Sequence, residues 1–186
     1  MSRPSADLRF RGIYDETYAR VFAYCLRRAP YEDAKDAAAD VYLILWRRLD
    51  EVPTGASTLP WLYVTARYVV ANQRRSKERQ LRLWERIRRD GQQHVDSPEV
   101  IVVRRAEDRE VLAAISKLSL LDQEVIRLAV WEELPQTGIG DVIGCSDRAV
   151  TMRLHRAKRR LARHLRTDET ETPIRPVIEQ REAQHE

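Results

Sequence analysis

The sequence contains little cysteine and little histidine. Its two cysteines, Cys25 and Cys145, lie far apart, and each sits in an apolar helical context. This placement favours two free thiols in a reducing compartment over a disulfide. The four histidines are scattered, so no cysteine and histidine cluster has the spacing of a zinc site. We therefore expect neither a disulfide framework nor a metal centre.

Long apolar runs are also missing. No window approaches the ~18 uninterrupted apolar residues of a membrane span. The N-terminal stretch "MSRPSADLRFRGIYDE" lacks the apolar core of a signal peptide. These absences predict a cytoplasmic protein with no membrane span.

Signals for β-strands are nearly absent, because the one β-branched run is "VIVV" at 100–103. Elsewhere the apolar residues recur with helical spacing, which predicts an all-α fold. In the N-terminal part we expect a helix from Tyr14 to Cys25, a second starting near Glu32, and a third from Pro60 to Arg89. The second helix should bury one apolar face, made of Ala34, Ala37, Val41, Leu45 and Leu49.

A polar segment, "DGQQHVDSP" at 90–98, divides the helical pattern and predicts a linker. We expect two small helical domains, residues 8–90 and 99–166, joined by a flexible connection at 91–98. The second domain should contain helices at 99–117, 121–131 and 136–143 and a long basic helix after Ser146. The segment 167–186 has two prolines and little apolar content, so we expect it to be disordered or loosely docked.

Basic residues are segregated along the chain. The formal net charge is only +4, but 74–89 and the helix after Ser146 are strongly basic, whereas the segment after Thr167 is rich in glutamate. Clustered arginine is typical of proteins that bind phosphates. A solvated basic surface would have the same composition, so composition alone leaves both interpretations open.

Residues 136–163 have the pattern of a helix-turn-helix. A short apolar helix is followed by Gly144, and Ser146 is a good N-cap for a second helix whose apolar stripe is Val150, Leu154, Ala157 and Leu161. In such units the second helix enters the major groove N-terminus first, while later basic residues hold phosphates. The candidates for base contacts are Arg148, Thr151, Met152 and Arg153, and those for phosphates are Arg156, Lys158 and Arg159. A basic helical hairpin that enters no groove is the alternative.

Two long stretches resemble the extracytoplasmic-function (ECF) sigma factors of bacterial RNA polymerase. "LSLLDQEVIRLAVWEELPQTGIGDVIGCSDRAVTMRLHRAKRRL" is similar to their region 4, with "RLHRAK" matching a characteristic run. "YDETYARVFAYCLRRAPYEDAKDAAADVYLILWRRLDEV" and "LPWLYVTARYVVANQRRSK" are similar to region 2. The two regions occur in the family's order and spacing, which is far more specific than a lone helix-turn-helix.

The resemblance implies a role for each region. The helix after "YEDA" would bind the β′ coiled coil of core RNA polymerase through an acidic edge, Asp33, Asp36 and Asp40. Region 4 would contact the β flap and read the −35 duplex. The third helix would capture the melted −10 element through Trp61, Thr65, Arg67, Tyr68, Asn72, Arg74 and Arg75. The loop 53–58 resembles the part that holds a flipped base.

The chain departs from the family's pattern at several positions. Ala39 stands where glutamine is frequent, Tyr68 where asparagine is frequent, and Gly138 and Gly140 where glutamate and alanine are more frequent. Each glycine costs roughly 0.5–1 kcal/mol relative to alanine inside a helix, which predicts a short or mobile first helix in the motif.

The implied function is that of a sigma factor that directs polymerase to promoters. It would not be an enzyme, it would need no cofactor, and an anti-sigma factor is a common partner in the family. A stand-alone helix-turn-helix regulator with a helical sensor domain is the alternative; it would bind duplex DNA without polymerase. A DNA-cutting or DNA-joining enzyme would need converging carboxylates or a nucleophile in a cleft, and the acids here lie on a predicted solvent-facing edge or after Thr167.

Overall fold

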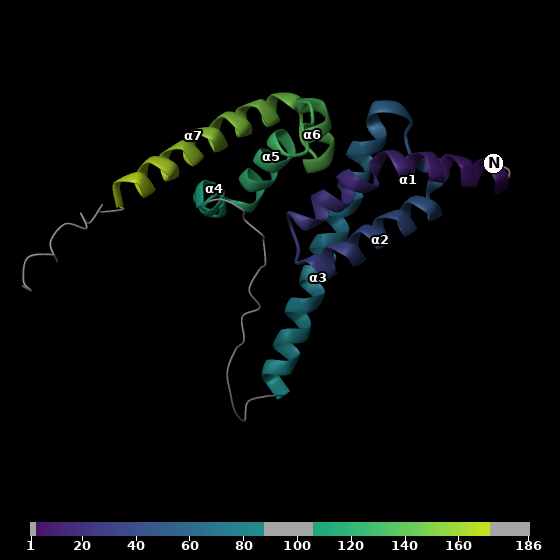
Figure 1. Ribbon diagram of the computed structural model, residues 1–186, viewed down its shortest axis with the longest axis horizontal. Helices are drawn as coiled ribbons and strands as arrows, with labels where there is room; N and C mark the ends of the chain where they lie inside the picture. The colour runs from purple at the N-terminus through teal and green to yellow at the C-terminus, as the bar shows by residue number, and fades with distance from the viewer. Residues whose placement is uncertain (1–2, 88–105, 172–186) are drawn as a thin grey trace, which may run out of the picture.

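The computed structural model describes residues 3–87 and 106–171, and within these ranges every regular element is helical (Figure 1). This confirms the all-α fold. The N-terminal half contains α1 (Arg3–Leu26), α2 (Tyr31–Arg47) and α3 (Thr58–Ile87), with two single-turn 3-10 helices (Leu49–Glu51 and Gly55–Ser57) between α2 and α3. The C-terminal half contains α4 (Ala106–Ser116), α5 (Leu120–Val130), α6 (Gln136–Ile143) and α7 (Asp147–Glu171).

The helix α1 is longer than the predicted segment that starts at Tyr14. A row of aromatic side chains begins earlier, at Phe10, and continues through Tyr14, Tyr18 and Phe22, and the first three of these rings pack against Tyr42 of α2. Because these side chains recur every four residues, they give α1 an apolar stripe that extends one turn upstream of the predicted start.

The helix α2 buries the face predicted for it, with one exception. Ala34, Ala37, Val41 and Leu45 are fully buried on α2, whereas Leu49 is buried from the 3-10 helix that follows. Cys25 is also buried here, and burial raises the pKa of its thiol to about 11. Both cysteines are free, as predicted.

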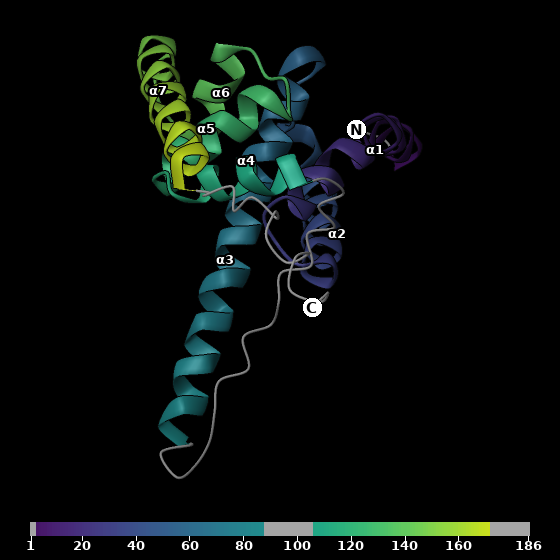
Figure 2. The ribbon, with the colours of Figure 1, turned by 60° about the vertical axis from the view of Figure 1, so that its left-hand side comes forward.

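The helix α3 has two different parts. Its first half packs Leu62, Ala66 and Val69 into the core, as predicted, together with Tyr63. Its second half projects away from the rest of the protein, as Figure 2 shows, and Leu81, Leu83 and Trp84 on it are more than half exposed. A helix of 30 residues is about 45 Å long at 1.5 Å per residue, which is longer than the core it packs against.

The C-terminal half differs from its predicted boundaries only at the two ends. The helices α5 and α6 match the predicted segments within one residue, and α4 begins at Ala106 in the described part. The helix α7 runs to Glu171, so residues 167–171 are helical where we expected an irregular segment. The predicted linker, the run at 100–103 and residues 172–186 lie outside the described residues.

The two halves, which we expected to be two small helical domains, pack directly against each other. Val125, Leu128, Ile139, Val142 and Val150 belong to the same buried apolar cluster as the core of the N-terminal half. The helix α6 lies against α3, which both ribbon views show (Figures 1 and 2). A second, smaller cluster of Ile115, Leu118, Ile126 and Ala157 belongs to the C-terminal half alone. None of the described helices is long and apolar enough to cross a membrane.

Candidate nucleic-acid interface

The turn between α6 and α7 has the geometry predicted for a helix-turn-helix. Gly144 adopts a left-handed conformation (φ 72°), and the N–H groups of Gly144 and Cys145 donate to the carbonyl oxygen of Gly140 at 2.8 and 3.0 Å. Ser146 Oγ accepts a hydrogen bond from the N–H of Ala149 at 3.4 Å, which is the predicted N-cap. The turn therefore directs α7 away from α6 at a fixed angle.

The two unusual glycines of α6 lie at close contacts. A Cβ atom on Gly140 would come within 2.6 Å of the carbonyl oxygen of Cys145, which is backbone on the far side of the turn. A Cβ atom on Gly138 would lie 3.4 Å from Cγ of Pro60 in α3, a normal contact distance. The sequence predicted only that these glycines weaken the helix; the structure shows that Gly140 also permits the turn to close.

Replacing Gly140 with alanine should lower the free energy of unfolding by about 1–2 kcal/mol, although alanine is the better helix former. The turn has to shift to accommodate the Cβ atom. Thermal and urea unfolding would measure the change, and Gly138→Ala is the matched control, for which we expect no loss. An equal gain in stability from both substitutions would show that helix propensity dominates at both sites.

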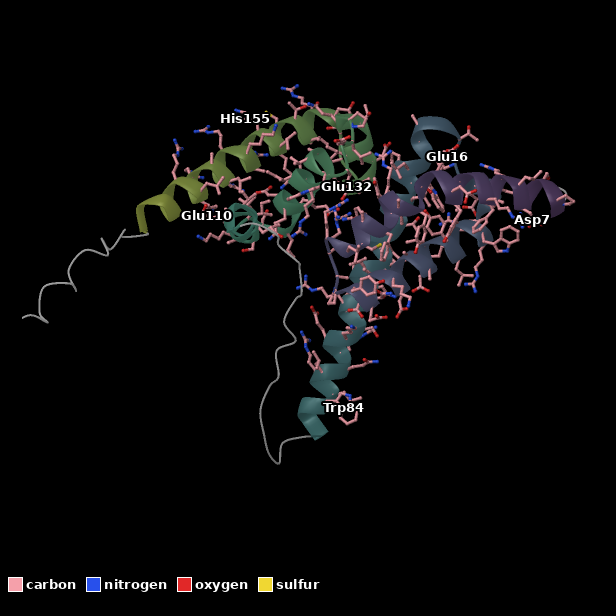
Figure 3. All side chains as sticks on the ribbon, in the orientation of Figure 1. Asp7, Glu16, Trp84, Glu110, Glu132 and His155 are labelled. Carbon is pink, nitrogen blue, oxygen red and sulfur yellow. The ribbon has the colours of Figure 1, made fainter. Side chains whose placement is uncertain are left out.

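The helix α7 separates an apolar face from a basic face. Val150 and Ala157 are fully buried and Leu154 and Leu161 half-buried, which is the predicted stripe. His155, labelled in Figure 3, lies on the outer side of α7, away from α5. The predicted DNA-contacting side chains are exposed except for half-buried Arg153; the exposed ones are Arg148, Thr151, Met152, Arg156, Lys158 and Arg159.

A buried carboxylate, which the sequence analysis missed, holds two arginines of α7. Asp122 on α5 is 1% exposed, and its two oxygens accept from Arg153 Nη1 at 3.1 Å and from Arg160 Nη1 at 2.5 Å. The backbone N–H of Asp122 also donates to Ser119 Oγ, the N-cap of α5. The burial of Asp122 could have been predicted from its helical spacing. Asp122 precedes Val125 and Ile126 by three and four residues, so it shares their buried face.

The predicted −10 residues on α3 fall into an exposed set and a partly engaged set. Tyr68, Asn72 and Arg75 are exposed. Trp61 and Thr65 are half-buried, and the Thr65 hydroxyl donates to the Trp61 carbonyl at 3.0 Å. Arg67 donates to the carbonyl oxygen of Val142 in α6 at 3.3 Å. Arg74 donates to Glu78 at 3.0 Å.

A shallow groove of about 220 Å³ between α2 and α3 brings Tyr68 and Asn72 next to Asp40. We predicted Asp40 as part of the acidic edge, together with Asp33 and Asp36. Asp36 and Asp40 are exposed on α2. Asp33 forms an ion pair with Lys77 of α3, and the Asp33 side chain is only 22% exposed. The acidic edge and the −10 face are therefore adjacent, and Asp33 already has a cation beside it.

The loop 53–58 lines a larger cleft between the two halves. The cleft has a volume of about 790 Å³ and is bounded by α1, by this loop and by residues 133–141. Within the loop, Gly55 has a positive φ (67°), and the Thr58 hydroxyl donates to the carbonyl of Pro53 at 2.8 Å. Across this cleft the loop faces residues 133–141 of the C-terminal half.

Comparison with known proteins places both halves in one family. Residues 13–80 match the family model of sigma-70 region 2, and residues 108–161 match that of sigma-70 region 4. RNA polymerase sigma factor YlaC of Bacillus subtilis is 27% identical over 165 residues, which cover 87% of this chain and 95% of YlaC. ECF sigma factor SigK of a Mycobacterium species (strain KMS) is 28% identical over 153 residues, 78% of this chain and 77% of SigK.

Solved structures show the same fold. Sigma factor RpoE of Bartonella quintana, determined with the anti-sigma factor NepR, has a TM-score of 0.64 at 19% identity and covers 86% of this chain and 98% of its own. CnrH, determined with the cytosolic domain of CnrY, has a TM-score of 0.60 at 21% identity, over 86% of this chain and 88% of its own.

The two family models in this order, on an all-helical chain with a helix-turn-helix near its end, define a transcription initiation factor of the sigma-70 class. The chain belongs to the sigma-70 family and, within it, to the ECF sigma factors. It functions with RNA polymerase in promoter-specific initiation, and sigma factors are initiation factors without catalysis of their own.

Proposed function

We propose that the exposed basic face of α7 reads the duplex −35 element, while α2 and α3 bind core polymerase and the melted −10 element. The observation that carries the proposal is the fixed turn at Gly144 and Ser146, from which α7 extends with six predicted DNA-contacting side chains exposed. Since polymerase and chromosomal DNA are its partners, we place the protein in the cytoplasm.

In the proposed complex, the side chains of α7 have two roles. Arg148, Thr151, Met152 and Arg153 lie in the first two turns, where a recognition helix meets base edges. Arg156, Lys158 and Arg159 lie farther along, where basic side chains hold phosphates. Arg153 forms an ion pair with Asp122 of α5, and its side chain is still 35% exposed. It can therefore contact DNA while it stays bonded to the protein.

The face of α3 that includes Tyr68 and Asn72 suits unpaired bases. An exposed ring offers a surface for stacking, and an amide offers both a donor and an acceptor to a base edge. Arg75 lies on the same part of α3 and is exposed for a phosphate. The neighbouring carboxylate of Asp40 repels the phosphate backbone, so we expect the strand to present bases, not phosphates, to the groove between α2 and α3.

Asp36 and Asp40 form the part of the acidic edge that is available to polymerase. Both are exposed on α2, on the side opposite its buried alanines, and among the described residues neither forms a hydrogen bond or an ion pair. Asp33 contributes less, because Lys77 already neutralises it.

Replacing Arg153 with alanine should weaken binding of the preferred −35 duplex by about 1–3 kcal/mol and relax the preference at one base pair. Lys158→Ala should weaken all duplexes about equally and reduce the salt dependence of binding. Binding to a library of −35 duplexes at two salt concentrations would measure both. A base-specific effect at Lys158, or a uniform one at Arg153, would contradict these roles.

Reversing the charge of Asp36 and Asp40 together, by D36K and D40K, should reduce the affinity for core polymerase at least tenfold, which is about 1.4 kcal/mol. The substitutions remove attraction and add repulsion toward a basic partner. Binding of labelled core measures the loss, and Asp50→Lys, an exposed acid on the 3-10 helix after α2, is the control. Unchanged affinity would exclude this edge as the docking surface.

Initiation with core polymerase separates this function from the alternative of a stand-alone regulator. The purified chain is mixed with core polymerase and a promoter library, and transcripts are sequenced. We expect specific transcripts only when both proteins are present. Tight binding of a duplex operator that core neither requires nor changes would favour the regulator.

An anti-sigma factor is the further partner we propose. RpoE and CnrH, the two solved structures with the same fold, were each determined with another protein bound, an anti-sigma factor in the case of RpoE. Binding of such a protein to this chain should compete with core polymerase.

A further inference from the structure

We propose that an ion-paired latch between residues 24–28, at the end of α1 and just after it, and the segment 124–132 holds the two halves of the free chain closed. This closed form has to open before the chain can act at a promoter. The proposal rests on the function proposed above. Glu132, labelled in Figure 3, lies where the C-terminal half meets the end of α1.

The latch consists of cations from one half and carboxylates from the other. Arg28 donates to both oxygens of Glu124 through Nε and Nη2, at 3.0 and 3.1 Å, and to Glu132 Oε1 through Nη1 at 3.0 Å. The Tyr24 hydroxyl donates to Glu124 at 2.8 Å, and Arg27 forms an ion pair with Glu132. Every donor in this set lies at the end of α1 or in the two residues after Leu26, and every acceptor lies in the C-terminal half.

The ions of the latch are out of water. The side chains of Arg28, Glu124 and Glu132 are only 6%, 11% and 1% exposed. Burial by itself would lower the pKa of Arg28, but Tyr24, Glu124 and Glu132 outweigh it and raise the pKa, so the guanidinium stays charged. Its carbon also lies 3.5 Å from the ring centre of Tyr24. A bidentate pair of this kind fixes one arrangement of the halves, since each charge is costly to leave without its partner.

Apolar contacts complete the closed form. Val125, Leu128, Ile139 and Val142 of the C-terminal half are buried in the cluster that contains the core of α1, α2 and α3. The carbonyl of Val142 accepts from Arg67, and Gly138 lies against Pro60. Arg67 is a predicted −10 residue, and Pro60 lies two residues after the predicted base-holding loop, so the closed form occupies part of the predicted −10 surface.

The closed form is also too short to span a promoter. Arg148 follows Val142 by six residues, so the Cα atoms of the two residues lie within about 20 Å of each other even if the chain between them is fully extended. The carbonyl of Val142 is hydrogen-bonded to Arg67 of α3. By their names the −35 and −10 elements lie about 25 base pairs apart, roughly 85 Å along B-form DNA at 3.4 Å per pair. One chain can therefore contact both elements only after α6 has separated from α3.

The proposal is tested by opening and by locking the interface. Gly138→Leu opens it, because the larger side chain must displace Pro60. The pair Pro60→Cys and Gly138→Cys locks it, because a Cβ on Gly138 would lie 3.4 Å from Cγ of Pro60. Both are made with Cys145→Ser, which leaves only buried Cys25. Circular dichroism and unfolding confirm that each variant is folded.

Two readouts are needed. Spin labels on cysteines at Asp7 and Glu110, exposed on α1 and α4, report the distance between the halves in the parent and in Gly138→Leu. Transcription with core polymerase reports activity. We expect one short distance in the parent, a longer and broader distribution in Gly138→Leu with at least as much initiation, and at least a tenfold loss of initiation in the oxidised lock, restored by dithiothreitol.

Each outcome bears on the proposal. An oxidised lock that initiates as well as its reduced form would overturn it, as would a parent whose halves are already apart without polymerase. The double exchange Arg28→Glu with Glu124→Arg should retain the short distance better than Arg28→Glu alone, and equal opening would overturn the role of the latch. A parent that never initiates with core, but shows the expected distances, would support the latch and overturn the sigma function.

Discussion

Replacing Arg28 with methionine should lower the free energy of unfolding by about 3–5 kcal/mol, the range found when one partner of a buried ion pair is removed. Of the hydrogen bonds described above, Glu124 would keep the one from the Tyr24 hydroxyl and Glu132 would keep its ion pair with Arg27, while both carboxylates remain between the halves. Since the halves can part to hydrate these charges, we expect the unfolding transition to split in two. Calorimetry and urea unfolding would measure both effects.

An exposed ion pair provides the control for Arg28. Arg74 and Glu78 are 67% and 45% exposed on one face of α3, and such pairs contribute less than about 1 kcal/mol. Arg74→Met should therefore leave a single transition near the parent midpoint. An Arg28→Met variant as stable as Arg74→Met would show that the apolar contacts alone hold the halves together.

Replacing Asp122 with alanine should have the second largest effect, a loss of about 3 kcal/mol in stability together with weaker binding of −35 duplex DNA. Asp122 is buried and accepts charged hydrogen bonds from two arginines of α7, each of which contributes about 1.5–3 kcal/mol. The sum is reduced because Arg153 and Arg160 are 35% and 48% exposed and regain water. Unfolding and duplex binding measure the two losses.

The measurement of duplex binding tests whether Asp122 positions the guanidinium of Arg153 for DNA. If Asp122 positions the guanidinium for the major groove, its removal weakens binding beyond the loss of folded protein. Asp141→Ala, which removes an exposed acid from α6, should change neither stability nor specificity. Tighter −35 binding by Asp122→Ala than by Asp141→Ala would show instead that Asp122 competes with DNA for Arg153.

The helices were predictable wherever local chemistry decides. The short apolar helix at 136–143, the turn glycine at 144 and the cap at Ser146 were read from the sequence, because each depends on neighbours within a few residues. The N-terminus of α1 was missed, because Phe10 extends the stripe only through its contacts with Tyr42 and Trp46 of α2.

The candidate site was predictable in its exposed part and not in its supports. The spacing of residues on α7 and α3 put arginines, Tyr68 and Asn72 on outward faces, which a helical repeat of 3.6 residues suffices to show. It could not show that Asp33 pairs with Lys77 or that Asp122 holds Arg153, because these pairs join residues 44 and 31 positions apart.

The sequence by itself determined an all-helical chain with a region 2-like half, a region 4-like half and a basic recognition helix, because helical period, capping and turn residues act over a few positions. Only the tertiary structure decided that the halves share one apolar cluster and a buried latch of Arg28, Glu124 and Glu132. Those residues are about 100 positions apart, and nothing in their local spacing distinguishes a buried interdomain ion pair from charges on a solvated helix.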